Sequence, residues 1–337
     1  MSVQIAPFAA DTASAEDLHA WYDVFADVSR ADSPGSPVSP SDHFVKRLCA
    51  PPSPLGRKLR WDARENGQLK GTAEAFLPAD ENDRCCVVTV RVPVRYRRRG
   101  LGTLLLRTIL AQIRQEGCDT IAGEVPTGTD GEKWTAALHF KDVLRLSHYV
   151  LDITTADRTQ WQAQPAAGFH LRRWTDAVPD DLLEGFARAR NAMADQPIGD
   201  ATFQHPDWTA ERVRQYEART LQSGASHRYV AAIDERSGQV AGFTETSIIA
   251  GHDSGNQEDT AVLRQYRGHG LGVAMKASML RWLTSELPSI KDVRTMTASD
   301  NAHMIGVNSS LGYSLHYTEV SMESGVDALE ELLRATR

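Results

Sequence analysis

The chain has 337 residues, of which 41% are hydrophobic and 24% are charged, and its formal net charge is −7. These values are typical of a globular protein with about two domains. The acidic balance argues against nucleic acid as the main partner and mildly favours a cationic substrate. No apolar run approaches the roughly 18 residues of a membrane span, and the first 20 residues are acidic rather than basic, so we expect a cytoplasmic protein without a signal peptide.

The cysteines form no metal-binding pattern. All lie in the first half of the chain and none belongs to a CxxC or Cys/His motif: Cys49, Cys85, Cys86 and Cys118. We therefore expect reduced thiols and no metal site.

The first half begins with a strand near 2–8 and a helix over 15–29 that Ser14 caps. A Pro- and Ser-rich loop over 30–56 holds only a short helical piece. A hairpin over 58–77 turns at Asn66 and Gly67, because that dipeptide favours a tight turn with positive φ. A strand over 85–92 follows.

A Gly-rich turn comes next, in the stretch VPVRYRRRGLGTLLLR from Val92 to Arg107. The apolar spacing after Gly100 predicts a helix, which Gly117 ends, and 120–125 is a further strand. The last strand of this half is expected at 148–153, and polar residues with Pro165 indicate a linker over 156–168.

The second half shows a similar order of elements. They are expected as strands at 169–174, 229–234, 240–249 and 293–297, helices at 180–193 and 208–223, and a helix that Asn301 caps before Gly312 and Tyr313.

The central stretch of this half, TAVLRQYRGHGLGVAMKASMLRWL from Thr260 to Leu283, predicts a strand, a Gly-rich turn and a helix. The glycines allow close backbone approach to a ligand. The first N–H groups of the helix suit a phosphate or pyrophosphate. The spacing matches neither a P-loop nor G-x-G-x-x-G.

The two turns are copies of one motif. Arg97, Gly100 and Gly102 correspond to Arg267, Gly270 and Gly272 at a constant offset of 270 − 100 = 170 residues. A repeat at half the chain length indicates a duplicated domain rather than a solenoid. We therefore expect an N-terminal domain over 1–155 and a C-terminal domain over 169–337.

The pattern R-x-x-G-x-G after a strand resembles the GNAT acyltransferase superfamily, whose turn holds the pyrophosphate of acetyl-CoA. The resemblance implies an α/β (α+β) fold with two tandem domains, each a mixed, mostly antiparallel twisted sheet flanked by helices. The second half is most similar to a bacterial tandem group that includes mycothiol synthase and enzymes acetylating aminoglycosides such as kasugamycin. That likeness rests on D-T-x-V-x-x-x-x-R-G-H-x-L-G-x-x-x-K, from Asp259 to Lys276, and on the later Asn301, Asn308 and Gly312-Tyr313.

The resemblance also implies which residues bind acetyl-CoA. In the second half these are Val262, Leu263, Arg264, Arg267, Gly268, His269, Gly270, Leu271, Gly272, Asn301 and Asn308; in the first half they are Val92, Val94, Arg97, Arg99, Gly100 and Gly102. The first half lacks the family's later Asn, Tyr and Gly-Phe, so we expect it to be structural, with or without bound CoA, and the second half to be catalytic.

Transfer to an amine needs a base, because only a neutral amine attacks a thioester. Glu245, Glu258 and Asp259 are the candidates. The family's oxyanion donor is an N–H of the preceding strand, here Val262 or Leu263, and the next N–H groups, here Leu263 and Arg264, pair with pantetheine.

The leaving sulfur needs an acid. The family's Tyr is replaced by Asn308, which cannot act as one, so Tyr313 is the candidate, with Tyr317 or water as substitutes.

These observations favour an acetyl-CoA-dependent N-acetyltransferase. The acidic chain favours a small cationic acceptor, of which an aminoglycoside-type antibiotic is our first choice. A mycothiol synthase-like acetylation of a cysteinyl sugar is one alternative. A non-catalytic CoA sensor or scaffold is another, because Asn308 replaces the acid. The protein is expected to act as a monomer or homodimer, without a nucleic-acid or membrane partner.

Overall fold

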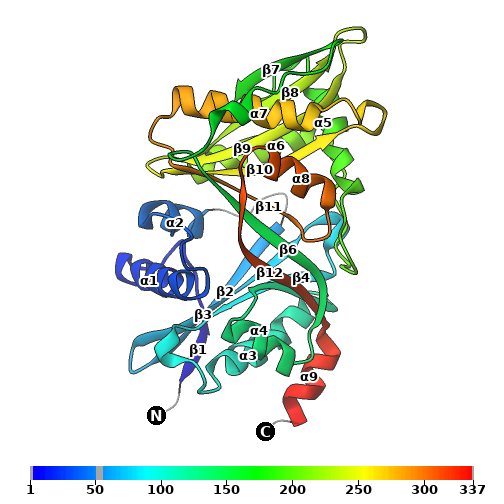
Figure 1. Ribbon diagram of the computed structural model, residues 1–337. Helices are drawn as coiled ribbons and strands as arrows, with labels where there is room; N and C mark the ends of the chain where they lie inside the picture. Colours follow the sequence, from blue (N-terminus) through cyan, green and yellow to red (C-terminus); the bar gives the residue numbers. More distant parts are fainter. Residues whose placement is uncertain (1–2, 51–55, 336–337) are drawn as a thin grey trace. The chain divides into compact units, whose positions relative to one another are not determined.

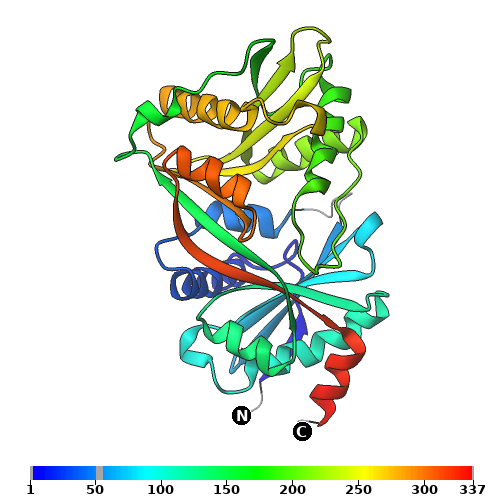
Figure 2. The same cartoon turned by 45° about the vertical axis from the view of Figure 1, so that its right-hand side comes forward.

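The computed structural model describes residues 3–50 and 56–335 and divides the chain into two compact units (Figures 1 and 2). Unit 1 consists of Met1–Arg145, Ile198–Gln204 and Glu319–Arg337, and unit 2 of Leu146–Pro197 and His205–Thr318. The units are thus interleaved along the sequence, so their boundaries do not coincide with the expected domains 1–155 and 169–337.

Unit 1 is built on a mixed sheet. Its strands are β1 (Gln4–Pro7), β2 (Gly56–Glu65), β3 (Gln68–Pro78), β4 (Cys85–Arg91), β5 (Thr120–Pro126) and the C-terminal part of β12 (Ser314–Gly325). Its helices are α1 (Ala15–Asp32), α2 (Ser41–Leu48), α3 (Leu101–Gln115), α4 (Asp130–Ala137) and α9 (Val326–Ala335). Only β4 and β5 pair in parallel; the other neighbours are antiparallel.

The predicted hairpin is confirmed. Strands β2 and β3 pair from Gly56–Pro78 to Glu65–Gln68. Asn66 and Gly67 between them have φ of 52° and 76°, the two positive values that a tight hairpin turn requires.

Unit 2 repeats this plan. Its strands are β7 (Phe169–Thr175), β8 (Ala225–Asp234), β9 (Val240–Ile249), β10 (Ser254–Val262), β11 (Asp292–Ala298) and the C-terminal part of β6 (Lys141–Asp152). Its helices are α5 (Leu183–Asn191), α6 (Ala210–Ser223), α7 (Leu271–Glu286) and α8 (Ala302–Ser310).

Strand alternation in unit 2 produces two cores on opposite faces of the sheet. Val230 and Ala232 of β8 pack in the core that contains α7, whereas Tyr229 and Ala231 pack with α5 and α6. Successive side chains of a strand point to opposite faces, so the sheet lies between these helix layers. The observed strands and helices confirm the predicted fold class.

Each unit is completed by a strand from the other half of the sequence. The last strand expected for the first half, β6, pairs with β11 from Asp152–Asp292 to Leu146–Ala298. In unit 1, β12 pairs with β5 from Glu319–Pro126 to Gly325–Thr120. This exchange is the physical reason why a division of the sequence at one linker does not describe the compact units.

Candidate functional site

The parallel strands β10 and β11 of unit 2 separate after a short contact. They pair only from Ser254–Asp292 to Asn256–Arg294, and both continue beyond that point. A β-bulge interrupts the pairing of β10 with β9 between Gln257 and Thr260. Separation and bulge together leave backbone groups of β10 without a neighbouring strand, as a site for an extended ligand requires.

The Gly-rich turn links β10 to α7. Gly268 and Gly270 have φ of 82° and 66°, and Gly270 is the N-cap of α7. A Cβ atom placed on Gly268, Gly270 or Gly272 would meet no heavy atom within 4 Å. The glycines therefore border open space at the N-terminus of a sixteen-residue helix, where the first N–H groups and the helix dipole favour an anion. This geometry fits a pyrophosphate.

The arginine of the motif holds the turn in place. Arg267 Nε donates to the carbonyl of Val262 at 3.1 Å, and its guanidinium pairs with Asp195 at 2.5 Å. In unit 1, Arg97 likewise binds the Val92 carbonyl at 2.9 Å and Asp32 at 2.7 Å. In both copies the side chain contacts protein, so the turn's backbone supplies the groups that face a ligand.

Two other predicted cofactor residues lie on the surface of the turn. His269 Nδ1 lies 3.2 and 3.1 Å from the carbonyl oxygens of Tyr266 and Arg267, and its ring packs against Phe169. Arg264 is exposed, with its guanidinium 3.5 Å from Asp195. Leu271 is 2% exposed and belongs to the core, where it anchors α7.

One predicted backbone donor is corrected. The N–H of Leu263 donates to the carbonyl of Ala241 at 2.9 Å, so it completes the sheet. Because donors of an antiparallel strand alternate between its two sides, the N–H of Val262 points to the side where β11 has separated. Val262 therefore remains the candidate oxyanion donor on this strand.

The predicted residues of α8 have distinct roles. Asn301 Oδ1 accepts from the N–H of Met304 at 3.1 Å and caps the helix, as expected. Asn308 is fully buried, and its Oδ1 accepts from Lys276 Nζ at 2.6 Å. A Cβ on Gly306, between them, would meet nothing within 4 Å, so α8 also borders open space.

Lys276 and Tyr313 form a buried polar cluster with Asn308. Lys276 is 1% exposed, and burial lowers its pKa to about 7. Its Nζ lies 5.2 Å from the centre of the Tyr313 ring. The Tyr313 hydroxyl has no hydrogen-bond partner among the described residues, and burial raises the pKa of Tyr313, so this hydroxyl stays protonated at neutral pH.

Glu245 lies at the centre of a saturated ion-pair network, so the structure does not support its predicted role as a base. Its side chain is fully buried; Oε2 accepts from Arg190 at 2.7 Å, and Oε1 accepts from the Tyr216 hydroxyl at 2.9 Å and contacts His227 Nδ1 at 2.8 Å. Burial opposes ionisation, but Arg190 and His227 outweigh it and lower the pKa of Glu245 to about 2. A carboxylate held this way remains ionised and positions its partners.

The bulge carries two carboxylates, Glu258 and Asp259, whose surroundings and pKa shifts differ from those of Glu245. The Ser247 hydroxyl donates to Glu258 Oε1 at 2.6 Å, and Asp259 accepts from Arg190 at 3.1 Å. Glu258 is solvent-accessible, yet protein surrounds it on most sides; this desolvation, with the charges of Glu245 and Asp259, raises its pKa to about 6. Burial also raises the pKa of Asp259, against the opposing effect of Arg190. A carboxylate that titrates near neutral pH and can be reached from solvent suits a general base.

The corresponding turn of unit 1 is partly covered. Gly100 keeps its positive φ of 75°, but Arg98 adopts 59° where unit 2 has Gly268. A Cβ on Gly102 would lie 3.6 Å from the Trp134 indole, whose Nε1 donates to Thr103 at 3.1 Å. Val92 and Arg99 flank this turn, and Val94 is exposed.

Strand β4 of unit 1 also lacks the catalytic geometry of β10. It separates from β5 after Val87–Ala122, but its pairing with β3 is regular from Thr72–Arg91 to Phe76–Val87. Without a bulge, this strand presents no displaced N–H groups for an oxyanion.

Sequence reasoning gave no role in the site to Arg190, Tyr216 or His227, and it noted Lys276 only as the last residue of the family signature. Arg190 is 3% exposed, and its guanidinium lies 4.0 and 4.6 Å from the ring centres of Trp208 and Tyr216. A signal was present, because Arg190 lies four residues after Phe186 on the apolar side of the predicted helix. An arginine on an apolar helix face requires a buried carboxylate or aromatic partner.

The sheet with separated strands, its bulge and the Gly-rich helix N-terminus define an acyl-CoA-dependent acyltransferase. The family model described as Acetyltransferase (GNAT) family matches residues 18–132 and 190–313, once in each half. The chain therefore belongs to this family, as a tandem protein, and members of the family use acetyl-CoA as co-substrate. No curated protein sequence matches the chain.

Solved structures share the tandem fold. A tandem GNAT protein from the clavulanic acid biosynthesis pathway is 24% identical with a TM-score of 0.81, over 96% of this chain and 99% of that one. A GCN5-related N-acetyltransferase from Sphaerobacter thermophilus is 14% identical with a TM-score of 0.69, over 96% of each chain. At these identities the likeness establishes the fold alone.

Among the residues that the structure describes, no helix is both long and apolar enough to cross a lipid bilayer. No cluster of three or more His, Cys, Asp or Glu side chains in residues 3–50 and 56–335 is arranged to hold a metal ion.

Proposed function

We propose that unit 2 catalyses acetyl transfer from acetyl-CoA to a primary amine of a small cationic acceptor. The backbone of β10 carries the proposal, because its Val262 N–H points to the side where β11 has separated and its bulge carries the solvent-accessible Glu258. The bound co-substrate supplies an acetyl thioester; the backbone at Gly268, Gly270 and Gly272 would hold its pyrophosphate.

The residues of the chain then supply proton transfer and orientation. Glu258, ionised above about pH 6, accepts the proton of the ammonium so that a neutral amine can attack. The Val262 N–H donates to the oxygen that becomes negative in the transition state. Tyr313 remains our candidate for the acid that protonates the leaving sulfur. Its hydroxyl is protonated and has no hydrogen-bond partner among the described residues.

Charge supports a cationic acceptor. Arg190 pairs with Glu245 and Asp259, Glu245 also contacts His227, and Glu258 is hydrogen-bonded to Ser247. Three carboxylates thus lie near a single arginine and one histidine, and an ammonium would add positive charge to balance them. We propose an aminoglycoside-type antibiotic, kasugamycin-like in its amino groups, as the acceptor. A mycothiol synthase-like cysteinyl sugar also has an ammonium group but carries fewer positive charges.

The test is thiol release from acetyl-CoA with a panel of amines: several aminoglycosides, a cysteinyl sugar, spermidine and a Lys peptide. We expect CoA release with a polycationic aminoglycoside and its loss in Glu258→Gln. Release only with the cysteinyl sugar would replace the proposed acceptor. CoA binding by calorimetry without release for any amine would refute catalysis and favour the CoA sensor.

A further inference from the structure

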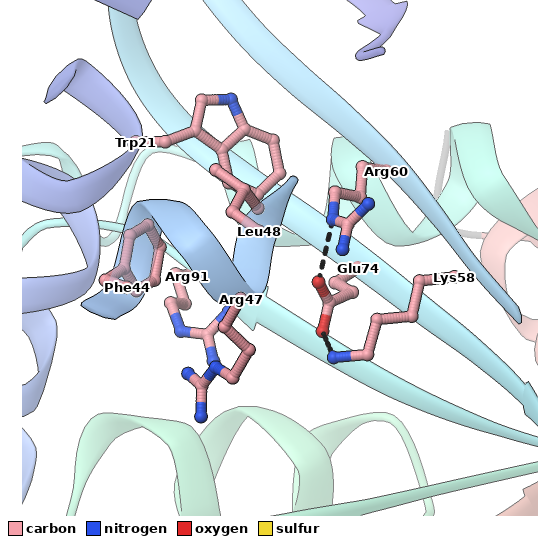
Figure 3. Close-up of a pocket in the computed structure, with 8 residues that line it drawn as sticks. All are labelled: Trp21, Phe44, Arg47, Leu48, Lys58, Arg60, Glu74 and Arg91. Atoms are coloured by element: carbon pink, nitrogen blue, oxygen red, sulfur yellow. Dashed lines mark hydrogen bonds and ion pairs between the residues drawn. The ribbon is translucent and has the colours of Figure 1, made fainter. Parts of the chain in front are cut away.

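Lys276 of unit 2 is a buried lysine without a counter-charge. Its side chain is 1% exposed, and no carboxylate of the described residues pairs with it. Lys58 of unit 1 shows the ordinary arrangement (Figure 3): burial lowers its pKa, but its Nζ donates to Glu74 at 2.7 Å, and this carboxylate opposes the effect. For Lys276, burial is the only cause of the lowered pKa. A buried, unpaired ammonium destabilises a fold, so packing alone does not explain a lysine at this position.

Two other buried polar groups beside Lys276 are unsatisfied. They are Nδ2 of Asn308, whose Oδ1 accepts from Lys276 Nζ at 2.6 Å, and the hydroxyl of Tyr313; neither has a hydrogen-bond partner in the part of the chain that the structure describes. Buried polar groups are normally paired, and apolar side chains of similar size would be more stable here. Polar groups kept at such a cost are expected at functional sites.

The C-terminus of α8 places Tyr313 beside Lys276. Gly312 follows the helix with φ of 93°, a value that glycine adopts without strain. The chain therefore turns back, and the Tyr313 N–H donates to the Asn308 carbonyl at 3.1 Å. This turn leaves the centre of the Tyr313 ring 5.2 Å from Lys276 Nζ, within the roughly 6 Å over which an ammonium is attracted by an aromatic ring.

The cluster of Lys276, Asn308 and Tyr313 lies beside the split between β10 and β11. Helix α7 packs on β8, β9 and β10, and α8 contributes to the same core. At the end of α8, a Cβ on Gly312 would lie 3.2 Å from Leu151 of β6, the strand on the other side of β11. The two helices therefore flank the split on one face of the sheet, and the hydrogen bond from Lys276 to Asn308 joins them. An extended ligand that follows the split would run past this cluster.

Tyr313 by itself is a weak acid. Burial raises its pKa, because the phenolate that remains after proton loss is poorly solvated. A positive charge within about 4–6 Å has the opposite effect and strengthens an acid by about tenfold to a thousandfold. Lys276 places an ammonium at this distance from the Tyr313 ring, so the two residues are matched: one must lose a proton, and the other supplies the charge that makes the loss easier.

We propose that Lys276 is a positioning residue of the acetyl transfer, whose ammonium stabilises the phenolate left when Tyr313 protonates the leaving sulfur. The proposal rests on the proposed function and names the group that makes its acid effective. As the carbon–sulfur bond breaks, its electron pair stays on the sulfur, which takes the proton of the Tyr313 hydroxyl. Tyr313 regains a proton from solvent after product release. Two protons leave the acceptor nitrogen by way of Glu258 and one enters at Tyr313, so each turnover releases one proton.

This role makes the reaction sensitive to pH on the basic side. Lys276 is charged below its pKa of about 7, so its contribution is present at pH 6 and is lost as the pH rises through 7. Glu258 is ionised above about pH 6. The kcat/KM profile of the wild type should therefore be bell-shaped, with the basic limb near pH 7. The side chains facing Lys276 do not produce this limb, because Asn308 does not titrate and burial keeps Tyr313 protonated.

The first measurement is CoA release between pH 5.5 and 9 with the acceptor that the amine panel identifies. Lys276→Met should lose about tenfold or more of kcat/KM near pH 6.5, and its basic limb should disappear. Lys291→Met is the matched control, because Lys291 is an exposed lysine of the same unit that pairs with Asp253. This control should keep both limbs and the wild-type rate.

The second measurement needs no co-substrate. A fluorinated tyrosine, whose phenol is a stronger acid, replaces Tyr313, and fluorine NMR of the free protein follows the ionisation of that phenol. We expect the phenolate to form at a pH about one unit lower, or more, when Lys276 is present than in the Lys276→Met background. A cluster that only packs would give the same titration in both backgrounds.

The fluorinated tyrosine also connects the cluster with the reaction. It should restore most of the rate that Lys276→Met loses, because a stronger acid needs less help from a neighbouring charge; a folding defect would not be restored. Equal fluorine titrations in the two backgrounds, or a basic limb that persists in Lys276→Met, would overturn the proposal while leaving the proposed function intact. Wild-type protein that releases no CoA with any amine would instead refute the proposed function, and this inference with it. Circular dichroism verifies that each variant is folded.

Discussion

The buried Lys276 makes a prediction about stability that can be worked out from its pKa. Its ordinary pKa is 10.5, and burial lowers it to about 7 in the folded protein. The difference of about 3.5 units corresponds to about 5 kcal/mol at about 1.4 kcal/mol per unit. This is the upper limit of the free energy by which the protonated lysine destabilises the folded state below pH 7.

The direction in which stability changes with pH follows from the number of protons that Lys276 binds in the folded and the unfolded state. Between pH 7 and 10.5 the unfolded chain binds more protons at this position than the folded protein, so the free energy of unfolding rises with pH. The rise is at most about 1.4 kcal/mol per pH unit, or close to 3 kcal/mol from pH 7 to 9. In Lys276→Met this dependence disappears. The lost hydrogen bond to Asn308 adds a penalty of about 1–3 kcal/mol that does not depend on pH.

The assay is urea unfolding of both proteins at pH 6, 7, 8 and 9. We expect the stability of Lys276→Met relative to wild type to be highest at pH 6 and to fall by about 2–3 kcal/mol at pH 9. Lys291→Met is the control, because Lys291 is exposed and paired with Asp253. The stability of the Lys291→Met protein relative to wild type should be constant over this pH range. A difference between Lys276→Met and wild type that is equal at pH 6 and pH 9 would refute the reasoning.

Three further predictions concern the site of unit 2. In Glu258→Gln, the acidic limb of the kcat/KM profile, expected near pH 6, should vanish with a rate loss of about 100-fold or more; a retained limb would exclude Glu258 as the base. Arg190→Met should lower the free energy of unfolding by about 3–5 kcal/mol, because Glu245 stays buried without its main partner; urea unfolding measures this, and a loss below 1 kcal/mol would contradict it. Gly272→Leu should retain the melting temperature, since its Cβ meets nothing, yet weaken CoA binding by calorimetry at least tenfold; unchanged affinity would place the pyrophosphate elsewhere.

Local patterns predicted the elements that depend on neighbouring residues. The hairpin at Asn66 and Gly67, the cap at Asn301 and the turn at Gly270 all follow from the backbone preferences of a few consecutive residues. The same patterns predicted two copies of the fold, because the motif recurs at a fixed offset.

Contacts between distant residues were not predictable in this way. Glu245 was a reasonable base until Arg190, Tyr216 and His227 were seen to occupy its oxygens, and those partners lie 18 to 55 residues away. Likewise, the alternation in β6 indicates a strand but not its neighbour. Only the structure shows that β6 pairs with β11 in unit 2.

The strand exchange has a consequence for the order in which the chain can fold on the ribosome. Pro126 of β5 pairs with Glu319 of β12, about 190 residues later. Domains usually fold as they emerge, the N-terminal one first. Here the sheet of unit 1 waits for β12, whereas unit 2, which ends at Thr318, can be completed earlier. The half of the protein that is synthesised first is therefore the one whose sheet is finished last, and until then the edge of β5 needs protection from other chains.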